Sequence, residues 1–334
     1  SAGVSNTANE TSVAMTLALA YPDRIAKARG APGQFLLANG RGAFLDPADA
    51  LAQSPYLVVA ELQGSAAATR ILAAARISEN EVLEAAAHRI MTRDEVAFDL
   101  AAAAIRARRV RSLDAIVISS ESRPVTPSPE TAALLARAVA STGIDRLPWS
   151  NAQQQLRHRI AFLRAAEGDG TTWPNLSDDA LSASAEAWLA PFLDHAIRMS
   201  DIDASTLGHA LDALVSWDVK RKLDIEAPTH FDAPTGNAHP IDYAGPGAPS
   251  LKIRVQELYG LKNHPTIAGG RLPLTLELLS PAHRQIQITR DLPGFWSGSW
   301  SAVRSEMRGR YPRHVWPDDP ANAQPTARAK PRGT

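Results

Sequence analysis

The sequence predicts a mixed α+β chain in three parts, and each part has its own pattern of apolar residues. Short apolar runs separated by turn residues occupy residues 34–77 and are typical of the strands of a small β-barrel. Apolar residues at helical spacing follow between residues 128 and 214 and indicate a helical middle region. Alternating runs over residues 251–290 then predict a β-rich C-terminal module, which a short terminal helix completes.

The first predicted elements are the end of a helix and three strands. Residues 1–12 are polar, and VAMTLALAYPDRIAKARG from residue 13 is interpreted as the end of a helix that Gly30 stops. The runs QFLLANGRGAFL, YLVVAEL and TRILAAARI supply the strands. Gly40-Arg41-Gly42 lacks the strand–helix context of a phosphate loop, so a tight hairpin turn is the favoured interpretation.

Residues 91–125 carry conflicting signals, and strands are the prediction. AAAAIRARRVR is rich in alanine, which favours a helix, yet apolar and basic residues alternate from Ile105 to Arg108. The AIVIS that follows is also typical of a strand. The arginines of RARRVR can contact phosphate, but a solvated strand face is the favoured interpretation.

Four helices are predicted in the middle region, each opened by a serine that can accept hydrogen bonds from the first turn. They are expected at 129–141 after Ser128, 151–166 after Ser150, 178–196 after Ser177, and from Ser205 onward. Leucines and tryptophans at spacings of three and four give these helices apolar faces. Such stripes are core residues rather than a cofactor site, so the region is interpreted as a bundle of linking helices.

The C-terminal module begins where apolar and polar residues alternate strictly. The runs SLKIRVQEL, RLPLTLELL and RQIQITR each place their apolar residues on one face, which indicates a sheet with one buried and one wet face. Ile286 and Ile288 belong to the expected buried face. The short link at 279–284 predicts a hairpin between the last two runs.

The stretch His283–Trp316 combines arginines with aromatic residues in a chain without net charge. Residues 251–334 hold 13 Lys and Arg against 6 Asp and Glu, a net of +7, whereas the first 250 residues carry −7. Guanidinium groups and flat rings suit a strand of nucleic acid, and the glycines beside Trp296 can leave its ring exposed for stacking. The open alternative is a packed C-terminal cap with a solvated arginine face. The candidate nucleic-acid-binding residues are Arg284, Arg290, Trp296, Arg304, Arg308, Arg310, Arg313, Lys252 and Arg254.

The short terminal helix is expected to begin at Trp300, behind a Ser299 cap, and to end at Gly309. Helical spacing then separates an inward face from a cationic face. The inward face holds Trp300, Val303 and Met307, and the cationic face holds Arg304 and Arg308.

Composition and missing motifs exclude several function classes. The chain has no cysteine, which excludes disulfides, thiolate zinc sites and cysteine nucleophiles and fits a reducing cytoplasm. No apolar run approaches the roughly 20 residues of a membrane span. Four residues of THFDAPTGNAHPID suggest a metal site, but their spacing matches no usual ligand pattern, and no serine-nucleophile motif is present. No metal and no catalytic residue are therefore expected. Because the chain starts at Ser1 without a signal-peptide pattern, it is expected to be a fragment or a processed form.

Several words of the sequence occur in an order that resembles a known family. They are RVQELYG, AGGRLPLTLELLSPA, QITRD, DLPGFWSGSW, VRSEMRGRYPRH and WPDDP, preceded by LALAYPDRIAKARG at 17–30 and APTHFDAPTGNAHPIDY at 227–243. Together they resemble the C-terminal region of the bacterial HrpB-type ATP-dependent RNA helicases, of the DEAH-box class, over nearly the whole chain. Trp300, where the family often has Tyr, and Asn237, in place of a usual Ser, are small departures.

The resemblance implies a helicase region without its motor. A motor needs a GxxxxGK[ST] loop for phosphates and an acidic box for magnesium, and the chain has neither. ATP and Mg²⁺ therefore belong to the two RecA-like motor domains of such a helicase, and no cofactor is expected in this chain. As an enzyme, the chain is expected to be inactive alone.

The same resemblance implies an OB-fold after the first helical residues, and with the patterns above it gives a domain layout. The expected parts are the end of a helical region (1–20), an OB-fold-like domain (21–90), a mixed, mainly helical linking domain (91–226), a β-rich HrpB-type C-terminal domain (227–316) and a flexible basic tail (317–334).

The implied function is that of an accessory C-terminal region of a cytoplasmic ATP-dependent RNA helicase. Its expected partners are single-stranded RNA, or DNA, and the RecA-like motor domains of the same protein, with no membrane. The alternative is a structural module that docks a partner protein and makes no direct contact with nucleic acid. Nucleic-acid binding that weakens with salt distinguishes the first function from the second.

The missing phosphate loop gives a first prediction. The purified chain should neither hydrolyse ATP nor unwind a duplex, because nothing in it can cradle the transferred phosphate and its magnesium. Phosphate release should stay at the background rate with and without RNA. RNA-stimulated hydrolysis in a preparation free of full-length helicase would contradict this prediction.

Overall fold

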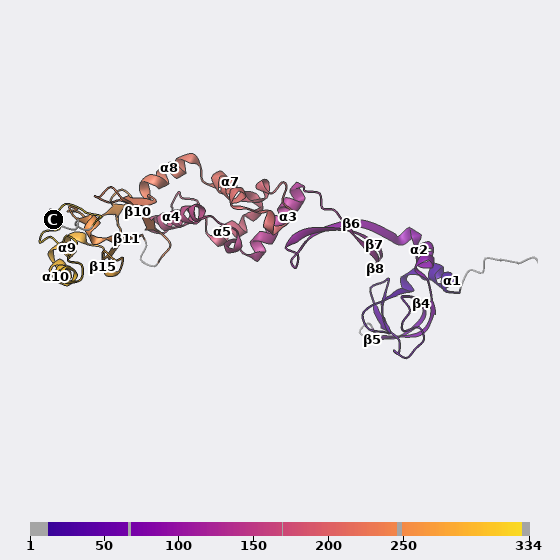
Figure 1. Cartoon of the computed structure of the whole chain (residues 1–334). Coiled ribbons are helices and arrows are strands. Elements are labelled where there is room, and N and C mark those ends of the chain that lie inside the picture. The colour runs from indigo at the N-terminus through magenta and orange to yellow at the C-terminus, as the bar shows by residue number, and fades with distance from the viewer. Residues whose placement is uncertain (1–12, 66–67, 169, 246–248, 329–334) are drawn as a thin grey trace, which may run out of the picture. The chain divides into compact units, whose positions relative to one another are not determined.

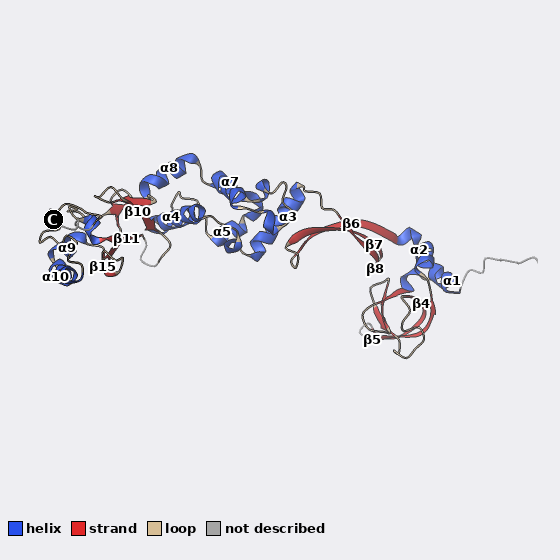
Figure 2. Ribbon diagram, viewed as in Figure 1, coloured by secondary structure: helices blue, strands red, loops and turns tan. Residues whose placement is uncertain are grey.

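The computed structural model describes residues 13–65, 68–168, 170–245 and 249–328, and the chain divides into two compact units, Ser1–Thr126 and Pro127–Thr334 (Figure 1). Each unit contains both helices and strands (Figure 2), which confirms the mixed α/β class. None of the helices in the described part of the chain has the length and apolar character that a membrane crossing requires. The finer domain boundaries at residues 90, 226 and 316 stay predictions.

The first unit contains a closed five-stranded barrel in which the strands follow the order β1-β2-β3-β5-β4. Alternating residues such as Phe35, Leu57 and Ile71 point inward and form its apolar core. Gly40, with a φ of +87°, turns the chain between β2 and β3, so the Gly40–Gly42 segment is the predicted hairpin turn. The strands are β1 (Ile25–Ala28), β2 (Gln34–Leu37), β3 (Gly42–Phe44), β4 (Tyr56–Ser65) and β5 (Ala68–Arg76).

The helix expected to run to Gly30 is shorter than predicted. Helix α1 (Val13–Ala20) ends before Pro22, and Ile25–Ala28 form β1 instead. Strand β1 pairs with both β2 and β4 and thereby closes the barrel. The long-range pairing of this segment thus outweighs the local helix preference of its alanines.

Residues 90–123 form a three-stranded antiparallel sheet, as the alternation predicts. Its register places Asp94 opposite Arg109 and Glu95 opposite Arg108, and ion pairs of 2.8 and 2.7 Å join these side chains. One end of the sheet packs with α1 and α2 in a shared apolar core. The elements are α2 (Glu79–Ala85), β6 (Ile90–Asp99), β7 (Ala104–Leu113) and β8 (Ile116–Arg123).

The second unit opens with the predicted helices. Ser128, Ser150 and Ser177 each accept a hydrogen bond from the backbone N–H three residues ahead, which confirms these three caps. The fourth cap is Asp203 rather than Ser205. The expected helix 178–196 is broken into two helices and a 3-10 turn that contains Pro191, whose ring nitrogen has no N–H for a helix hydrogen bond. The helices are α3 (Pro129–Thr142), α4 (Asn151–Glu167), α5 (Asp178–Ala183), α6 (Ala185–Trp188), α7 (Ala204–Leu214) and α8 (Trp217–Glu226).

A buried arginine fixes α4 against the end of α8. Arg159 is 5% exposed; its Nε donates to the carbonyl of Ala227 at 2.5 Å, and its Nη2 lies 2.6 Å from a carboxylate oxygen of Asp224. The ring of Phe162, one turn along α4, packs on Tyr243 with 5.5 Å between centroids. These contacts set the first strands of the C-terminal module beside α4.

The C-terminal module contains a five-stranded sheet of order β15-β14-β11-β10-β9 and a small β12-β13 pair. Strands β14 and β15 form the predicted hairpin, whereas β11 lies parallel to β14. Leu276 and Leu278 are fully buried as expected, but Ile288 is 52% exposed and does not belong to the buried face. The strands are β9 (His230–Asp232), β10 (Ala238–Asp242), β11 (Ser250–Arg254), β12 (Thr266–Ile267), β13 (Leu272–Pro273), β14 (Thr275–Leu279) and β15 (Gln285–Thr289).

Two short helices, α9 (Leu292–Ser297) and α10 (Trp300–Arg310), carry three of the aromatic residues of the module, Phe295, Trp296 and Trp300. Trp300 is 1% exposed and Met307 is also buried, which confirms two residues of the predicted inward face, whereas Val303 is only partly buried. Four rings surround that of Trp300 at centroid distances of 5.4–6.0 Å, namely those of Tyr259, Phe295, Trp296 and Trp316. Helix α10 begins at Trp300 as predicted, but the Ser299 side chain makes no cap hydrogen bond, and the helix continues past Gly309 to Arg310.

The segment 317–328, expected to belong to a flexible tail, is hydrogen-bonded to the module. The carbonyl of Pro317 accepts from the indole Nε1 of Trp300 at 2.9 Å, and that of Pro320 accepts from the backbone N–H of Gly260 at 2.9 Å. A third bond joins the N–H of Thr326 to the carbonyl of Gln256 at 3.0 Å. The remaining residues of the expected tail, 329–334, lie outside the described part of the chain.

The aromatic cluster gives a prediction about stability. Trp300→Ala should lower the free energy of unfolding by about 3–5 kcal/mol, because it leaves a cavity at the centre of four packed rings. Trp217→Ala is the matched control, since that ring is 69% exposed and its removal should change stability by less than about 0.5 kcal/mol. All seven tryptophans lie in the second unit, so their fluorescence during urea unfolding reports on that unit. Equal urea midpoints for the two variants would contradict the packing described here.

Candidate nucleic-acid interface

Trp296 is not available for stacking, contrary to the expectation from its glycine neighbours. Its ring is 8% exposed and packs on Tyr259, Phe295 and Trp300. Its Nε1 donates a hydrogen bond of 3.1 Å to the carbonyl of Leu261. The tryptophans of the C-terminal stretch therefore build a core.

Arg304 and Arg308 differ, although the sequence places both on one cationic helix face. Arg304 is partly buried; its Nε donates to the carbonyl of Trp316 at 2.9 Å, and its Nη2 pairs with Asp318 at 2.8 Å. Arg308 is exposed on the same helix. Arg304 therefore holds the segment after α10, whereas Arg308 is free to meet a ligand.

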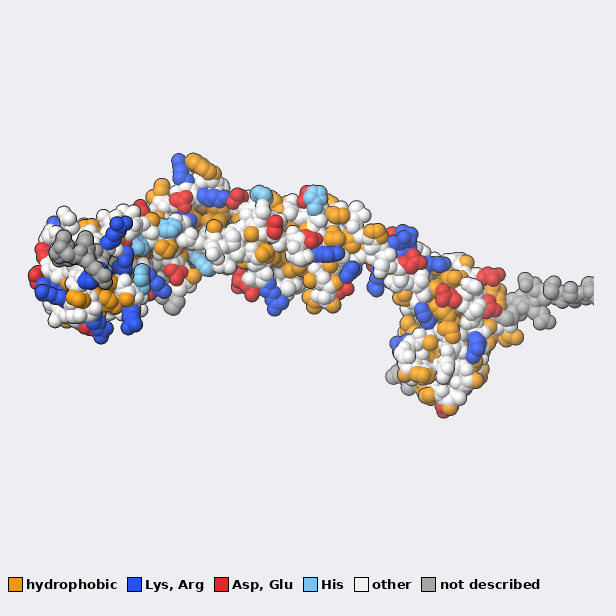
Figure 3. All heavy atoms as spheres, in the orientation of Figure 1, with side chains coloured by type: hydrophobic (Ala, Val, Ile, Leu, Met, Phe, Trp, Pro, Cys, Tyr) orange, Lys and Arg blue, Asp and Glu red, His pale blue; other side chains and the backbone are white. Residues whose placement is uncertain are grey.

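The other candidate cations fall into two groups. Arg290 donates to Thr275 at 2.9 Å, and Arg310 pairs with Glu306 at 3.1 Å. Arg284, Arg308 and Arg313 are exposed, and none of them has an ion-pair partner among the described residues. On the face shown in Figure 3, Lys and Arg side chains gather over the C-terminal module.

The last two candidates, Lys252 and Arg254, border a buried carboxylate that gathers four side chains. Glu257 is 1% exposed, and its Oε2 accepts from Nδ2 of Asn237 at 2.7 Å and from Oγ1 of Thr235 at 3.2 Å. The same oxygen lies 3.0 Å from Nε2 of His239, and Oε1 accepts from Nε of Arg254 at 2.9 Å. Residues of two conspicuous sequence motifs, APTGNAH and RVQELYG, thus contact each other through one carboxylate.

The charge state of Glu257 follows from these contacts. Burial raises the pKa of its carboxyl, but hydrogen bonds from Asn237, Arg254 and His239 lower it further than burial raises it. The net pKa lies below the ordinary value of 4.5, so the group is ionised at neutral pH. Arg254 is therefore neutralised by Glu257 and contributes little free charge to a ligand.

A pocket of about 370 Å³ opens beside this carboxylate. Its lining is Asn237, Ala238, His239, Lys252, Ile253, Arg254, Glu257, Leu279 and His283. The Lys252 side chain is 66% exposed and lies 3.7 Å from Glu277, close enough for a weak surface ion pair. Two imidazoles and this ammonium group form a polar rim around an already neutralised carboxylate.

The nearby His314 carries no charge at neutral pH. Burial lowers the pKa of its imidazole, and the positive charges of Arg254 and Arg313 lower it further. Arg313 is exposed, so the positive potential it creates there faces solvent.

Sequence reasoning missed an exposed arginine–tryptophan pair on α8. All seven tryptophans are described, and six of them are at most 9% exposed, whereas Trp217 is 69% exposed. The guanidinium carbon of Arg221 lies 4.9 Å from the centroid of its ring. Hydrophobic and cationic side chains project over α8 in Figure 3. The available signal was the spacing of Trp217, Arg221 and Ile225 on one face, opposite the buried Leu223.

The chain is similar to a known helicase over nearly its full length. The family described as "ATP-dependent helicase C-terminal" matches residues 188–320. The ATP-dependent RNA helicase HrpB of Escherichia coli (strain K12) is 38% identical over 327 residues, which are 97% of this chain and 40% of that protein.

Two solved structures are also similar. The crystal structure of the E. coli DExH-box NTPase HrpB matches 95% of this chain and 39% of its own, with 38% identity and a TM-score of 0.58. That of the Escherichia coli DEAH/RHA helicase HrpB matches 91% and 38%, with 34% identity and a TM-score of 0.52. The chain thus spans about two fifths of the relatives it matches, and the predicted resemblance to the C-terminal region of HrpB-type helicases is confirmed.

The Glu257 network gives a prediction with a defined pH dependence. Glu257→Gln should lower the free energy of unfolding at pH 7 by about 1–3 kcal/mol, because it leaves buried donors poorly matched. The folded state lowers the pKa of Glu257, so its stabilisation is complete above 4.5 and is lost as pH falls through the lower folded value. The stability difference between the two proteins should therefore shrink between pH 5 and pH 3, as urea unfolding would show.

The exposed carboxylate of Glu306, which pairs with Arg310 on α10, supplies the control. Glu306→Gln should change stability little at either pH. A Glu257→Gln deficit that is equally large at both ends of the pH range would show that shape, not charge, makes Glu257 important.

Proposed function

We propose that this chain, which corresponds to the C-terminal part of an ATP-dependent helicase, binds single-stranded nucleic acid on the basic surface of its C-terminal module. In this role it guides RNA, or DNA, relative to the motor domains of the same protein. ATP and Mg²⁺ would bind those motor domains and not this chain. The expected cytoplasmic location remains part of the proposal.

The observation that carries the proposal is the division among the candidate arginines. Arg304 and Arg254 are committed to internal partners, whereas Arg284, Arg308 and Arg313 are exposed around the same module. Exposed cations contribute little to folding, so these three are available for phosphates at small cost to stability. The pocket beside Lys252 supplies a concave site for one such phosphate.

The barrel of the first unit supports the same function. Five strands closed in the order β1-β2-β3-β5-β4 match what an OB-like fold requires, and such barrels bind oligonucleotides on one face. We infer that the barrel offers a second, weaker contact for the strand. Both units then take part in guiding it.

A second candidate function, docking of a partner protein, has one observation in its favour. Leu214, Trp217 and Ile225 are exposed at the end of α7 and along α8. Three basic and three acidic residues balance each other on α8, so this face offers phosphates little net attraction. Exposed Trp and Arg are common anchors of protein interfaces, and the motor domains are the partner that this surface would take.

The two functions separate in a salt titration. Binding of a labelled 12-nucleotide RNA should weaken from 50 to 200 mM salt, with log K falling by about 0.7 per phosphate contacted for each unit of log salt. The double variant Arg308→Ala/Arg313→Ala should reduce this slope by up to about 1.4 and leave the melting temperature unchanged. Fluorescence anisotropy of the labelled RNA measures the binding constant of each protein at each salt concentration.

Two single variants control this experiment. Arg137→Ala removes an exposed arginine of α3, far along the chain from the proposed surface, and should leave the slope unchanged. Arg304→Ala removes a structural arginine from the same helix as Arg308 and should lower the melting temperature instead. RNA binding with an unaltered slope in the double variant would mean that the RNA contacts other residues of the chain, and absence of salt-dependent RNA binding by the unmodified chain would favour the docking function of α8.

A further inference from the structure

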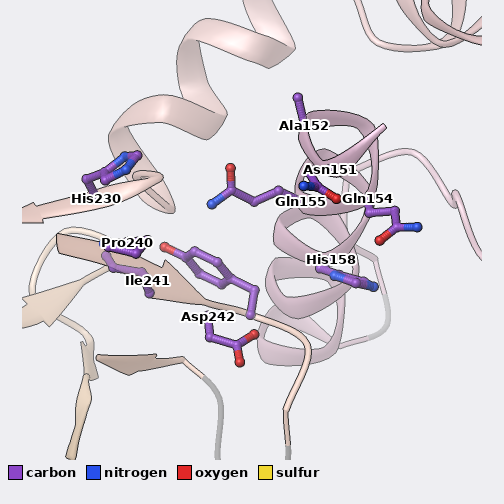
Figure 4. A pocket seen from close by; sticks show the side chains of 10 residues that line it. Asn151, Ala152, Gln154, Gln155, His158, His230, Pro240, Ile241 and Asp242 are labelled. Carbon is purple, nitrogen blue, oxygen red and sulfur yellow. The ribbon is translucent and has the colours of Figure 1, made fainter. Parts of the chain in front are cut away.

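A second cavity lies between the first two turns of α4 and strand β10, and nothing in the proposed function uses it. It measures about 460 Å³, and its walls include Asn151, Gln154, Gln155, His158, His230 and Tyr243. In Figure 4 the Gln155 side chain extends from the helix toward His230 and the strand that carries Pro240 and Ile241. The volume is within the range of small-molecule sites.

The helical wall is polar, and three of its four spaced residues are exposed. Its residues recur at i, i+3, i+4 and i+7 from Asn151, the spacing that normally presents apolar residues to a core. Here all four are polar, while the buried residues of α4, such as Ile160 and Leu163, belong to later turns. In the described part of the chain the side chains of Gln155 and His158 make no hydrogen bond. Gln155 is half-buried and His158 is exposed, so their donors and acceptors face solvent and are accessible to a ligand.

The opposite wall includes the ring of one tyrosine. Tyr243 is 7% exposed, and its hydroxyl donates to the carbonyl of Pro228 at 2.7 Å. Its ring is fixed by Phe162 from the same helix as Gln155. Only a small part of this ring reaches the cavity, too little for a base to stack on, and that part offers a ligand one rigid apolar contact.

The charges of the lining argue against a phosphate in this cavity. Asp242 is its one charged carboxylate, and neither lysine nor arginine lines it. Side-chain amides each carry donors and an acceptor, the combination that matches the edge of a nucleobase. Unpaired bases of single strands are recognised in this way, by amide hydrogen bonds and contact with an aromatic ring.

We propose that this cavity binds one unstacked nucleobase of a single strand, with Gln155 reading its hydrogen-bonding edge and Tyr243 forming the apolar wall. The inference deepens the proposed function and rests on it, since the strand is held by its phosphates elsewhere on the unit. The amide site would add a base preference to a contact that is otherwise independent of sequence.

Nucleosides, which carry no phosphate, test the cavity apart from the basic surface. Adenosine, guanosine, cytidine and uridine should be titrated into the full chain by calorimetry or by ligand-observed NMR. At least one should bind, and Gln155→Ala should weaken it roughly 5- to 100-fold, the discrimination expected of one amide–base pair. Gln53→Ala, at an exposed glutamine of the first unit, should leave the affinity unchanged.

Homopolymeric 12-nucleotide RNAs complete the test. The chain should prefer one of them, and Gln155→Ala should remove the preference while the salt slope stays as it was. If Gln155→Ala does not fold, His158→Ala replaces it, because that side chain is exposed and lines the same cavity.

The two proposals fail in different ways. RNA binding with a normal salt slope but without nucleoside binding or base preference would overturn the cavity assignment alone. Loss of all RNA binding, with nucleosides still bound through Gln155, would overturn the proposed function and leave the cavity as a nucleoside site.

Discussion

A buried carboxylate stays ionised only when hydrogen bonds replace the water it has lost, and Glu257 meets this condition by drawing on segments far apart in sequence. The loop before β10 contributes Thr235 and Asn237, β10 contributes His239, and β11 ends in Arg254. The hydrogen bonds to the Glu257 carboxylate thus fix where these segments meet. The shape of the adjacent pocket follows, because three of the four partners of Glu257 also line it.

Features set by neighbouring residues could be predicted from the sequence. The serine caps at Ser128, Ser150 and Ser177 act within three residues, and alternation in β7 and β14 reflects a two-residue period. The hairpin of β14 and β15 needs a link of a few residues. In each case the interacting residues lie only a few positions apart, so a short sequence pattern includes all of them.

The candidate site could not be predicted in this way, because the roles of its residues depend on contacts with partners far away in the sequence. The indole of Trp296 finds its acceptor at Leu261, and Arg304 finds its carboxylate at Asp318. Local composition made both residues resemble ligand-binding groups, and distant partners turned them into structural ones. Trp217 shows the opposite case, because its exposure results from an apolar stripe on α8 that no other described element covers. Exposure, which decides whether a cation or a ring can bind, is a tertiary property.

The contacts of residues 317–328 determine where this protein can be truncated without loss of stability. A truncation after Trp316, the end that strand and helix patterns suggest, would strip the acceptor from the indole N–H of Trp300 and from the backbone N–H of Gly260. Trp300 is 1% exposed, and an orphaned donor on a buried residue costs about 1–3 kcal/mol, a large share of the stability of an ordinary domain. The proline-rich segment, which its composition suggests is dispensable, thus holds the module together through its hydrogen bonds. Shorter versions of the protein should therefore retain this segment through Arg328.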